Sequence, residues 1–145
     1  VAALQQSGAM VLCLDKEKPL VGTQADLFEL FGAPRAPYRI DKTLQDNEEV
    51  ELCGIRIKVL ATCGHTAGGA CYMALDEEGK KYLFSGDTLF AGSIGRTDFP
   101  TGDLRALRES LKRLAALDDM PVYAGHGDET TISAERQTNP FLTDL

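Results

Sequence analysis

The chain has 145 residues, of which 43% are hydrophobic and 26% are charged, and its formal net charge at pH 7 is -7. This length suits one domain with one core and is short for two. An acidic chain without a Lys/Arg-rich block is not expected to bind nucleic acid, and no apolar run reaches the ~18 residues of a membrane span. With no signal peptide either, we predict a cytoplasmic protein that does not associate with membranes.

The first half of the chain predicts short helices and strands. Residues 1–7, followed by Gly8, have the pattern of a helix that ends there and has no visible start, so we expect a segment upstream. Residues 9–14 predict a short strand, and residues 23–31 predict a helix that stops at Gly32. The alternating runs 49–52 and 55–60 predict a β-hairpin across Cys53 and Gly54.

The second half continues this alternation. Residues 70–75 and 81–85 predict another hairpin, and residues 121–124 a short buried strand. Asp103 is placed to cap a helix whose leucines fall on one stripe, and a last helix is predicted over residues 131–138. The apolar strands contain Tyr72 and Tyr123, which are therefore expected to pack in the core.

The cysteines are expected to be reduced. The four are spread along the chain without a C-x-x-C pair, each in or beside an apolar stretch: Cys13, Cys53, Cys63 and Cys71. We interpret them as core residues. A catalytic thiol remains the alternative for Cys63, which lies two residues before His65.

Three polar side chains predict a metal site. The only two histidines, His65 and His126, lie in glycine-framed loops after predicted strands, and Asp87 follows the strand that ends at Ser85. Strand ends at one edge of a layered α/β fold can converge. Taken singly, each histidine could be a loop or buried imidazole, and Asp87 could cap a turn. A dinuclear hydrolytic centre needs more than three ligands, so the chain carries about half of one.

The motifs around these side chains resemble a known family. The segments Gly64-His65-Thr66-x-Gly68, Phe84-Ser85-Gly86-Asp87-Thr88-Leu89-Phe90 and Gly125-His126-Gly127 resemble the C-terminal half of the metallo-β-lactamase superfamily, and more closely its glyoxalase II-like (hydroxyacylglutathione hydrolase-like) branch. Segments 92–100 and 135–142 match small bacterial members of that branch. The resemblance implies an α/β (α+β) fold, a partial αββα sandwich, in which residues 1–145 are the C-terminal two-thirds of a single domain.

The resemblance also implies roles for the site residues. His65 would bind the first metal, His126 the second, and Asp87 would bridge both as the catalytic carboxylate. The implied cofactor is two zinc ions, with iron or manganese in some members, and the implied reaction is hydrolysis of a small thioester such as a hydroxyacylglutathione. Ser85, Thr88 and Asp98 are expected around the ligands as hydrogen-bond partners.

Arg96 is the candidate substrate contact. It matches the basic residue that grips a glutathione carboxylate in glyoxalase II, and a guanidinium suits a bidentate carboxylate contact. The alternative is structural: Arg96 could hold its own loop through Asp98 or Asp103.

The chain departs from the family in one large respect. The family's His-x-His-x-Asp-His motif would precede Val1 and is not in this sequence, and Ala67 stands where proline is usual. We therefore expect an isolated chain that binds metal at low occupancy, is inactive alone, and forms a homo-oligomer or swapped dimer through an exposed sheet face.

Two other functions stay open at this stage. One is a persulfide dioxygenase-like enzyme with a single iron, because that group shares Gly-Arg-Thr-Asp-Phe, found here at residues 95–99. The other is a metal-free binding or structural module.

Overall fold

The computed structural model describes residues 1–23, 31–33 and 36–145. The helix predicted over residues 23–31 lies mostly outside this part of the chain. The described elements, in chain order, are α1 (Ala2–Gln6), β1 (Leu12–Leu14), β2 (Lys42–Leu44), β3 (Glu49–Leu52), β4 (Ile55–Ala61), β5 (Ala70–Leu75), β6 (Lys81–Gly86), β7 (Leu89–Phe90), β8 (Ser93–Ile94), α2 (Leu104–Ala115), β9 (Pro121–Ala124), β10 (Thr130–Thr131), α3 (Ile132–Thr138) and α4 (Pro140–Thr143).

A six-stranded sheet forms the centre of the molecule. Its strand order is β10-β9-β6-β5-β4-β3, and all neighbours are antiparallel except β6 and β9, which are parallel. Two small sheets accompany it, the parallel pair β1-β2 and the antiparallel pair β7-β8. Because β5 is antiparallel to both β4 and β6, the strands β4, β6 and β9 all run in one direction, so their carboxyl ends lie at the same edge of the sheet.

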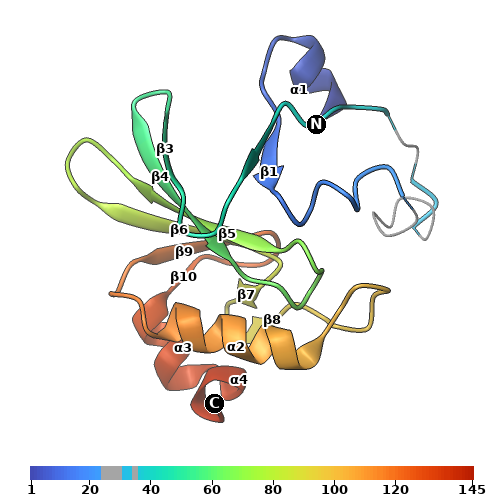
Figure 1. The fold of residues 1–145 in the computed structure, drawn as a ribbon. Helices are drawn as coiled ribbons and strands as arrows, with labels where there is room; N and C mark the ends of the chain where they lie inside the picture. Colours follow the sequence, from blue (N-terminus) through green and yellow to red (C-terminus); the bar gives the residue numbers. More distant parts are fainter. Residues whose placement is uncertain (24–30, 34–35) are drawn as a thin grey trace.

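The layers follow from the two faces of this sheet. Helices α2, α3 and α4 lie against one face, while β1 and α1 lie on the other side (Figure 1). On the helix side, Leu83 and Val122 of the sheet belong to a buried cluster with Leu107, Leu111 and Leu114 of α2. On the other side, Leu14 of β1 and Leu44 of β2 pack on Val59 of β4. Helices α2 to α4, the six-stranded sheet and the small β1-β2 sheet thus follow one another, which confirms the predicted α/β fold and agrees with part of an αββα sandwich.

Local sequence signals account for most of the element boundaries. At the first hairpin turn, Cys53 and Gly54 both have positive φ, 53° and 79°, as a tight two-residue hairpin turn requires. The Asp103 carboxylate accepts hydrogen bonds from the amides of Arg105 and Ala106, and Thr131 caps α3 in the same manner. Both hairpins, the strand at residues 121–124 and the last two predicted helices are therefore confirmed.

Several predictions need correction. The first strand is shorter than predicted, covering only Leu12–Leu14. Cys53 is exposed because it lies at a turn, whereas Cys13 and Cys71 are buried and Cys63 is half-buried; all four cysteines are free. Tyr123 is 36% exposed because it lies on the sheet face opposite Val122, beyond the strands that β1 and β2 cover.

The elements that the sequence did not predict are short. β2, β7, β8 and β10 have two or three residues each, which is too few to show a period. Asn139 ends α3, as expected, but its side chain also accepts a hydrogen bond from the amide of Phe141 and so begins α4. Among the described residues, no helix combines the length and apolar character needed to cross a membrane.

Candidate metal centre

The loop that carries His65 is fastened to helix α2. It follows β4, and its Gly64 has a φ of 139° and packs so closely on the backbone of Leu107 that a Cβ would overlap it. The Asp103 amide donates to the Gly64 carbonyl over 2.8 Å, and the Ser110 hydroxyl donates to the Cys63 carbonyl over 2.7 Å. The cap and the middle of α2 thereby fix the position of the His65 loop.

The turn that carries Asp87 is held from beneath by buried hydroxyl groups. The Ser85 hydroxyl donates to the Leu89 carbonyl over 2.7 Å, and the Thr88 and Thr62 hydroxyls lie 3.1 Å apart. Ser85 and Thr88 were predicted as hydrogen-bond partners around the ligands. The Ser85 bond fixes the backbone of the turn and the Thr88 bond joins the turn to the residue after β4, so both residues support Asp87 through its turn.

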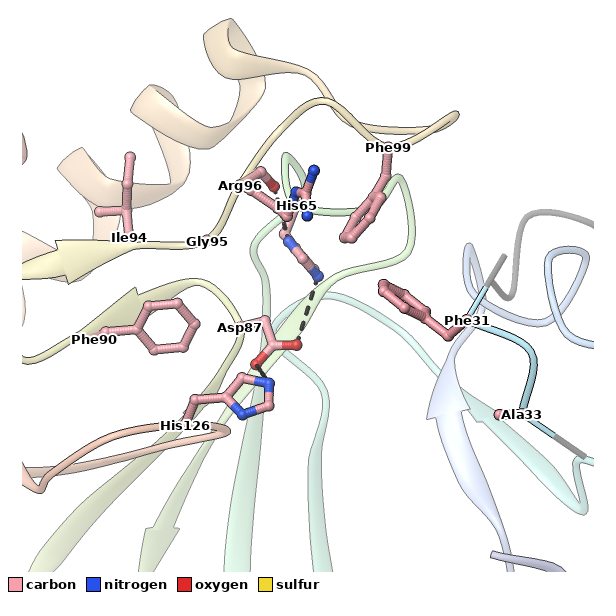
Figure 2. Close-up of a pocket in the computed structure, with 10 residues that line it drawn as sticks. All are labelled: Phe31, Ala33, His65, Asp87, Phe90, Ile94, Gly95, Arg96, Phe99 and His126. Atoms are coloured by element: carbon pink, nitrogen blue, oxygen red, sulfur yellow. Dashed lines mark hydrogen bonds and ion pairs between the residues drawn. The ribbon is translucent and has the colours of Figure 1, made fainter. Parts of the chain in front are cut away.

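The three predicted ligands converge at the carboxyl ends of β4, β6 and β9. Figure 2 shows His65 and His126 on two sides of Asp87. His65 Nε2 lies 3.5 Å from Asp87 Oδ2, and His126 Nε2 lies 3.6 Å from Asp87 Oδ1. Each carboxylate oxygen thus faces a different imidazole, which is the arrangement of a bridging carboxylate.

These distances suit shared metal coordination better than direct hydrogen bonds. Two ligands of one tetrahedral zinc, with bonds of about 2.0–2.1 Å, lie about 3.3 Å apart. His65 and Asp87 would give two donors to one ion, and Asp87 and His126 two donors to a second. In the described part of the chain, no group of three or more His, Cys, Asp or Glu side chains is placed to hold a single ion. Taken together, the residues present would offer two ligands to each of two ions.

The backbone sets the tautomer of His65. Its Nδ1 lies 2.8 Å from the carbonyl oxygen of Arg96. A carbonyl can only accept a hydrogen bond, so Nδ1 carries a proton, and in the neutral imidazole Nε2 is then the nitrogen with the lone pair. This is the tautomer that a metal ligand needs.

Two glycines leave room for the carboxylate. A Cβ at Gly125 would collide with Oδ1 of Asp87, and one at Gly95 would overlap the Asp87 carbonyl oxygen and approach the Cβ of His65. The amide of Gly125 also donates to the Gly86 carbonyl over 2.8 Å, which joins the Asp87 and His126 loops. The glycines of these motifs are thus explained by close packing around Asp87.

The ligands open into a cavity of about 600 Å³. Its lining includes the three ligands together with Arg96, Gly95 and a set of apolar residues: Phe31, Ala33, Phe90, Ile94 and Phe99. Arg96, the predicted substrate contact, therefore does line the cavity.

The Arg96 guanidinium is held by a carboxylate of its own loop. Its Nε lies 2.6 Å from Oδ1 of Asp98 and its Nη2 lies 2.5 Å from Oδ2. Hydrogen bonding from Arg96 lowers the pKa of Asp98 to about 2, so this carboxylate stays ionised well into acid. Asp103, the other partner considered for Arg96, instead caps α2.

A buried network that the sequence analysis missed supports the cavity wall. The Glu135 carboxylate, 3% exposed, accepts hydrogen bonds from the Gly92 amide (2.9 Å), the Asn139 side chain (2.7 Å) and the Thr130 hydroxyl (2.6 Å). The Asn139 side chain also donates to the Ser93 carbonyl over 3.0 Å. The network ties α3 to the β7-β8 hairpin. The available signal was the spacing of Glu135 and Asn139, one helical turn apart beside an apolar face.

Known proteins are similar to most of this chain. Residues 7–126 match the family model described as the metallo-beta-lactamase superfamily. Hydroxyacylglutathione hydrolase GloC of Haemophilus influenzae is 40% identical over 136 residues, which cover 88% of this chain and 61% of that protein. The chain therefore spans less than two-thirds of this relative's length.

Solved structures give the same result for the fold. The structure of TTHA1623 in a di-iron-bound form is similar, with a TM-score of 0.81 and 36% identity, covering 98% of this chain and 70% of that one. BLEG-1 B3 metallo-beta-lactamase has a TM-score of 0.84 and 32% identity, covering 98% of this chain and 69% of that one.

Proposed function

The chain belongs to the metallo-beta-lactamase superfamily and, within it, to the glyoxalase II-like branch. On this premise, we propose that it forms the catalytic part of a metal-dependent thioester hydrolase. The proposed substrate is a small thioester such as a hydroxyacylglutathione, and the proposed metal is zinc. One observation carries this proposal: each oxygen of the Asp87 carboxylate faces the Nε2 atom of a different histidine.

Each residue of this centre would have a separate role. Metal ions bound here would supply a hydroxide nucleophile near neutral pH and polarise the thioester carbonyl. Asp87 would be a ligand of both metal ions, and His126 would be a further ligand of the second ion. His65 keeps its proton on Nδ1, against the Arg96 carbonyl, so its Nε2 stays free to ligate. The adjoining cavity would hold the substrate beside these ligands.

The proposal is tested by zinc binding, with thiol release as a second measurement. We expect occupancy below one ion per chain after dialysis, because the chain gives two donors per ion, but saturable binding when zinc is in excess. Asp87→Asn removes the bridging charge and should abolish that binding, whereas Asp128→Asn, in the same loop as His126, should not. Equal binding by wild type and Asp87→Asn would refute the site. Thiol release from a thioester is expected only with zinc in excess.

A second candidate is a persulfide dioxygenase-like enzyme with one iron. The difference in burial between the two histidines favours it: the His65 side chain is 18% exposed and that of His126 is 79% exposed, so a single ion would be better shielded at the first position. The segment at residues 95–99 supports it as well. Iron-loaded protein that forms sulfite from a glutathione persulfide, and releases no thiol from thioesters, would replace the first proposal with this one.

A further inference from the structure

Buried polar side chains from three strand ends gather beside the turn that carries Asp87. Thr62 follows β4, Cys71 lies in β5 and Ser85 lies in β6, and all three are 0% exposed. Thr88, in the turn itself, is 3% exposed. Because water does not reach these groups, each depends on the others for its hydrogen bonds.

The contacts among these groups close a ring. Cys71 Sγ donates to the Ser85 carbonyl over 3.5 Å and lies 3.3 Å from Thr62 Oγ1. Thr62 Oγ1 in turn lies 3.1 Å from Thr88 Oγ1. The Thr88 amide then donates to the same Ser85 carbonyl over 3.0 Å, which completes the ring.

The direction of each hydrogen bond in the ring follows from the thiol. Burial raises the pKa of Cys71 to about 11, so near neutral pH Cys71 is a thiol with a single proton. That proton goes to the Ser85 carbonyl, which can only accept, so Cys71 Sγ accepts from the Thr62 hydroxyl. Thr62 Oγ1 has then used its own proton and accepts from the Thr88 hydroxyl. Every member thus has one role, and no donor of the ring is spare.

The ring joins the loops of two candidate ligands. Thr62 closes the base of the loop that carries His65, because its amide donates to the Gly69 carbonyl over 2.9 Å. A Cβ at Gly69 would lie only 2.7 Å from the Thr62 carbonyl oxygen, so the two strands of this loop approach closely. The other side of the ring is the turn at residues 85–88, which carries Asp87. The ring therefore fastens the His65 loop to the Asp87 turn.

From these contacts we propose that Thr62 and Cys71 are positioning residues of the candidate metal centre, whose side chains set the separation of His65 and Asp87. This inference rests on the proposed function and adds to it two residues outside the donor set. His126 follows β9, which contributes no residue to the ring, so a change in the ring acts mainly on the metal position between His65 and Asp87.

A zinc titration of the Thr62 variants tests this positioning. Thr62→Val keeps the shape of the side chain but removes its hydroxyl, whereas Thr62→Ser keeps the hydroxyl. The chain has two histidines, so NMR can follow each imidazole separately. Thr62→Val should raise the zinc concentration that half-saturates the His65 signals about tenfold, and that for His126 by less. Thr62→Ser should stay close to wild type.

The thiol is tested in the same titration. Cys71→Ala should raise the half-saturating zinc concentration of His65 as Thr62→Val does, whereas Cys71→Ser, which can still donate and accept, should not. Ile132→Val is the control for lost stability, because Ile132 is a buried core residue of α3 outside the ring. This control should bind zinc like wild type.

Amide hydrogen exchange of the metal-free chain tests the ring without zinc. Thr62→Val should speed exchange of the Thr88 amide about tenfold relative to the Ile132 amide, which donates to the Met120 carbonyl, and Thr62→Ser should not. The proposal is overturned if Thr62→Val leaves this exchange ratio unchanged, if it leaves His65 half-saturation unchanged, or if Thr62→Ser loses as much as Thr62→Val. A wild type that binds no zinc would refute the proposed metal centre instead, and the exchange ratio would still decide whether the ring holds the Asp87 turn.

Discussion

At Gly125, the absence of a side chain is what allows the Asp87 carboxylate to face both histidines. A Cβ at this position would collide with Asp87 Oδ1, the oxygen that faces His126. The φ of Gly125 is not in the left-handed region, so alanine is compatible with the backbone angles. Its Cβ would also lie 3.3 Å from the Gly86 carbonyl carbon, but its most severe contact would be with the Asp87 carboxylate.

We therefore expect Gly125→Ala to lower zinc affinity about 10- to 100-fold by turning the carboxylate, with little loss of folding stability. Competition with a chromophoric chelator measures the affinity, and urea unfolding measures the stability. Asp128→Ala is the control from the same loop. Unchanged zinc affinity in Gly125→Ala would mean that Asp87 does not ligate through Oδ1.

The sequence could identify the candidate ligands but not the cavity. His65, Asp87 and His126 stand out because polar groups after strands, framed by glycines, form a local pattern. Phe99 and Arg96 lie in a long loop, and their pairing with His65 joins positions about thirty residues apart. Such contacts depend on how loops fold over one another, so no local period records them.

At the scale of elements, the buried carboxylate of Glu135 links α3 to the β7-β8 hairpin through hydrogen bonds. Its carboxylate receives three hydrogen bonds in a site that is nearly closed to solvent. Glutamine can keep them, because its oxygen can face Gly92 and Asn139 while its amide group donates to the Thr130 hydroxyl, which can turn to accept.

Glu135→Gln should therefore destabilise the protein by about 1 kcal/mol, and Glu135→Leu by about 3 kcal/mol, since leucine leaves buried donors without acceptors. Urea unfolding of the two variants measures this difference. Equal losses would show that the size of the side chain, and not its hydrogen bonding, holds the hairpin.

A second link between elements joins α2 to the end of β4. The Arg113 guanidinium donates to Asp46 Oδ1 over 2.7 Å and to the Ala61 carbonyl over 3.1 Å. Burial opposes ionisation of Asp46, but hydrogen bonds from the Ala61 amide and Arg113 outweigh it and lower its pKa below the ordinary 3.8. A lowered folded-state pKa means that this carboxylate stabilises the fold above that ordinary value, and that the contribution is lost as the pH falls below it.

Asp46→Asn should thus cost about 1 kcal/mol near neutral pH, a modest value because the pair is partly exposed. The difference from wild type should be constant above the ordinary pKa of 3.8 and should shrink as the pH falls below it and through the lowered folded-state pKa, because wild-type Asp46 then becomes protonated as well. Urea unfolding across this range measures it. A difference that is constant with pH would assign the effect to packing.

At the scale of the whole molecule, the strands and hairpins could be predicted from the sequence better than which face of the sheet is covered. The strands and their order along the chain follow from alternation and turn residues, as the hairpin at Cys53 and Gly54 shows. The burial of Tyr123 was overestimated because the sequence of an apolar strand does not show which of its two faces is covered by another element. That depends on β1 and β2, which cover only part of the sheet.

The uncovered part of this sheet face forms an apolar surface. Its exposed members are Leu52, Ile55, Phe84 and Tyr123, which are 36–48% exposed. The Phe84 and Tyr123 rings stack with centroids 5.7 Å apart, so they present one continuous aromatic surface. Because burying such a surface is favourable, we expect two copies of the chain to associate through it, weakly and reversibly, since it is smaller than a standard interface.

Phe84→Thr should reduce this association, since threonine keeps the strand while removing the aromatic ring. Sedimentation velocity over a range of concentrations measures the association, and wild type should show a rising average mass that Phe84→Thr lacks. Leu104→Gln is the control, because Leu104 is an equally exposed apolar residue on helix α2, on the opposite side of the sheet. A wild type that stays monomeric at all concentrations, or a control that behaves like Phe84→Thr, would show that this face does not mediate self-association.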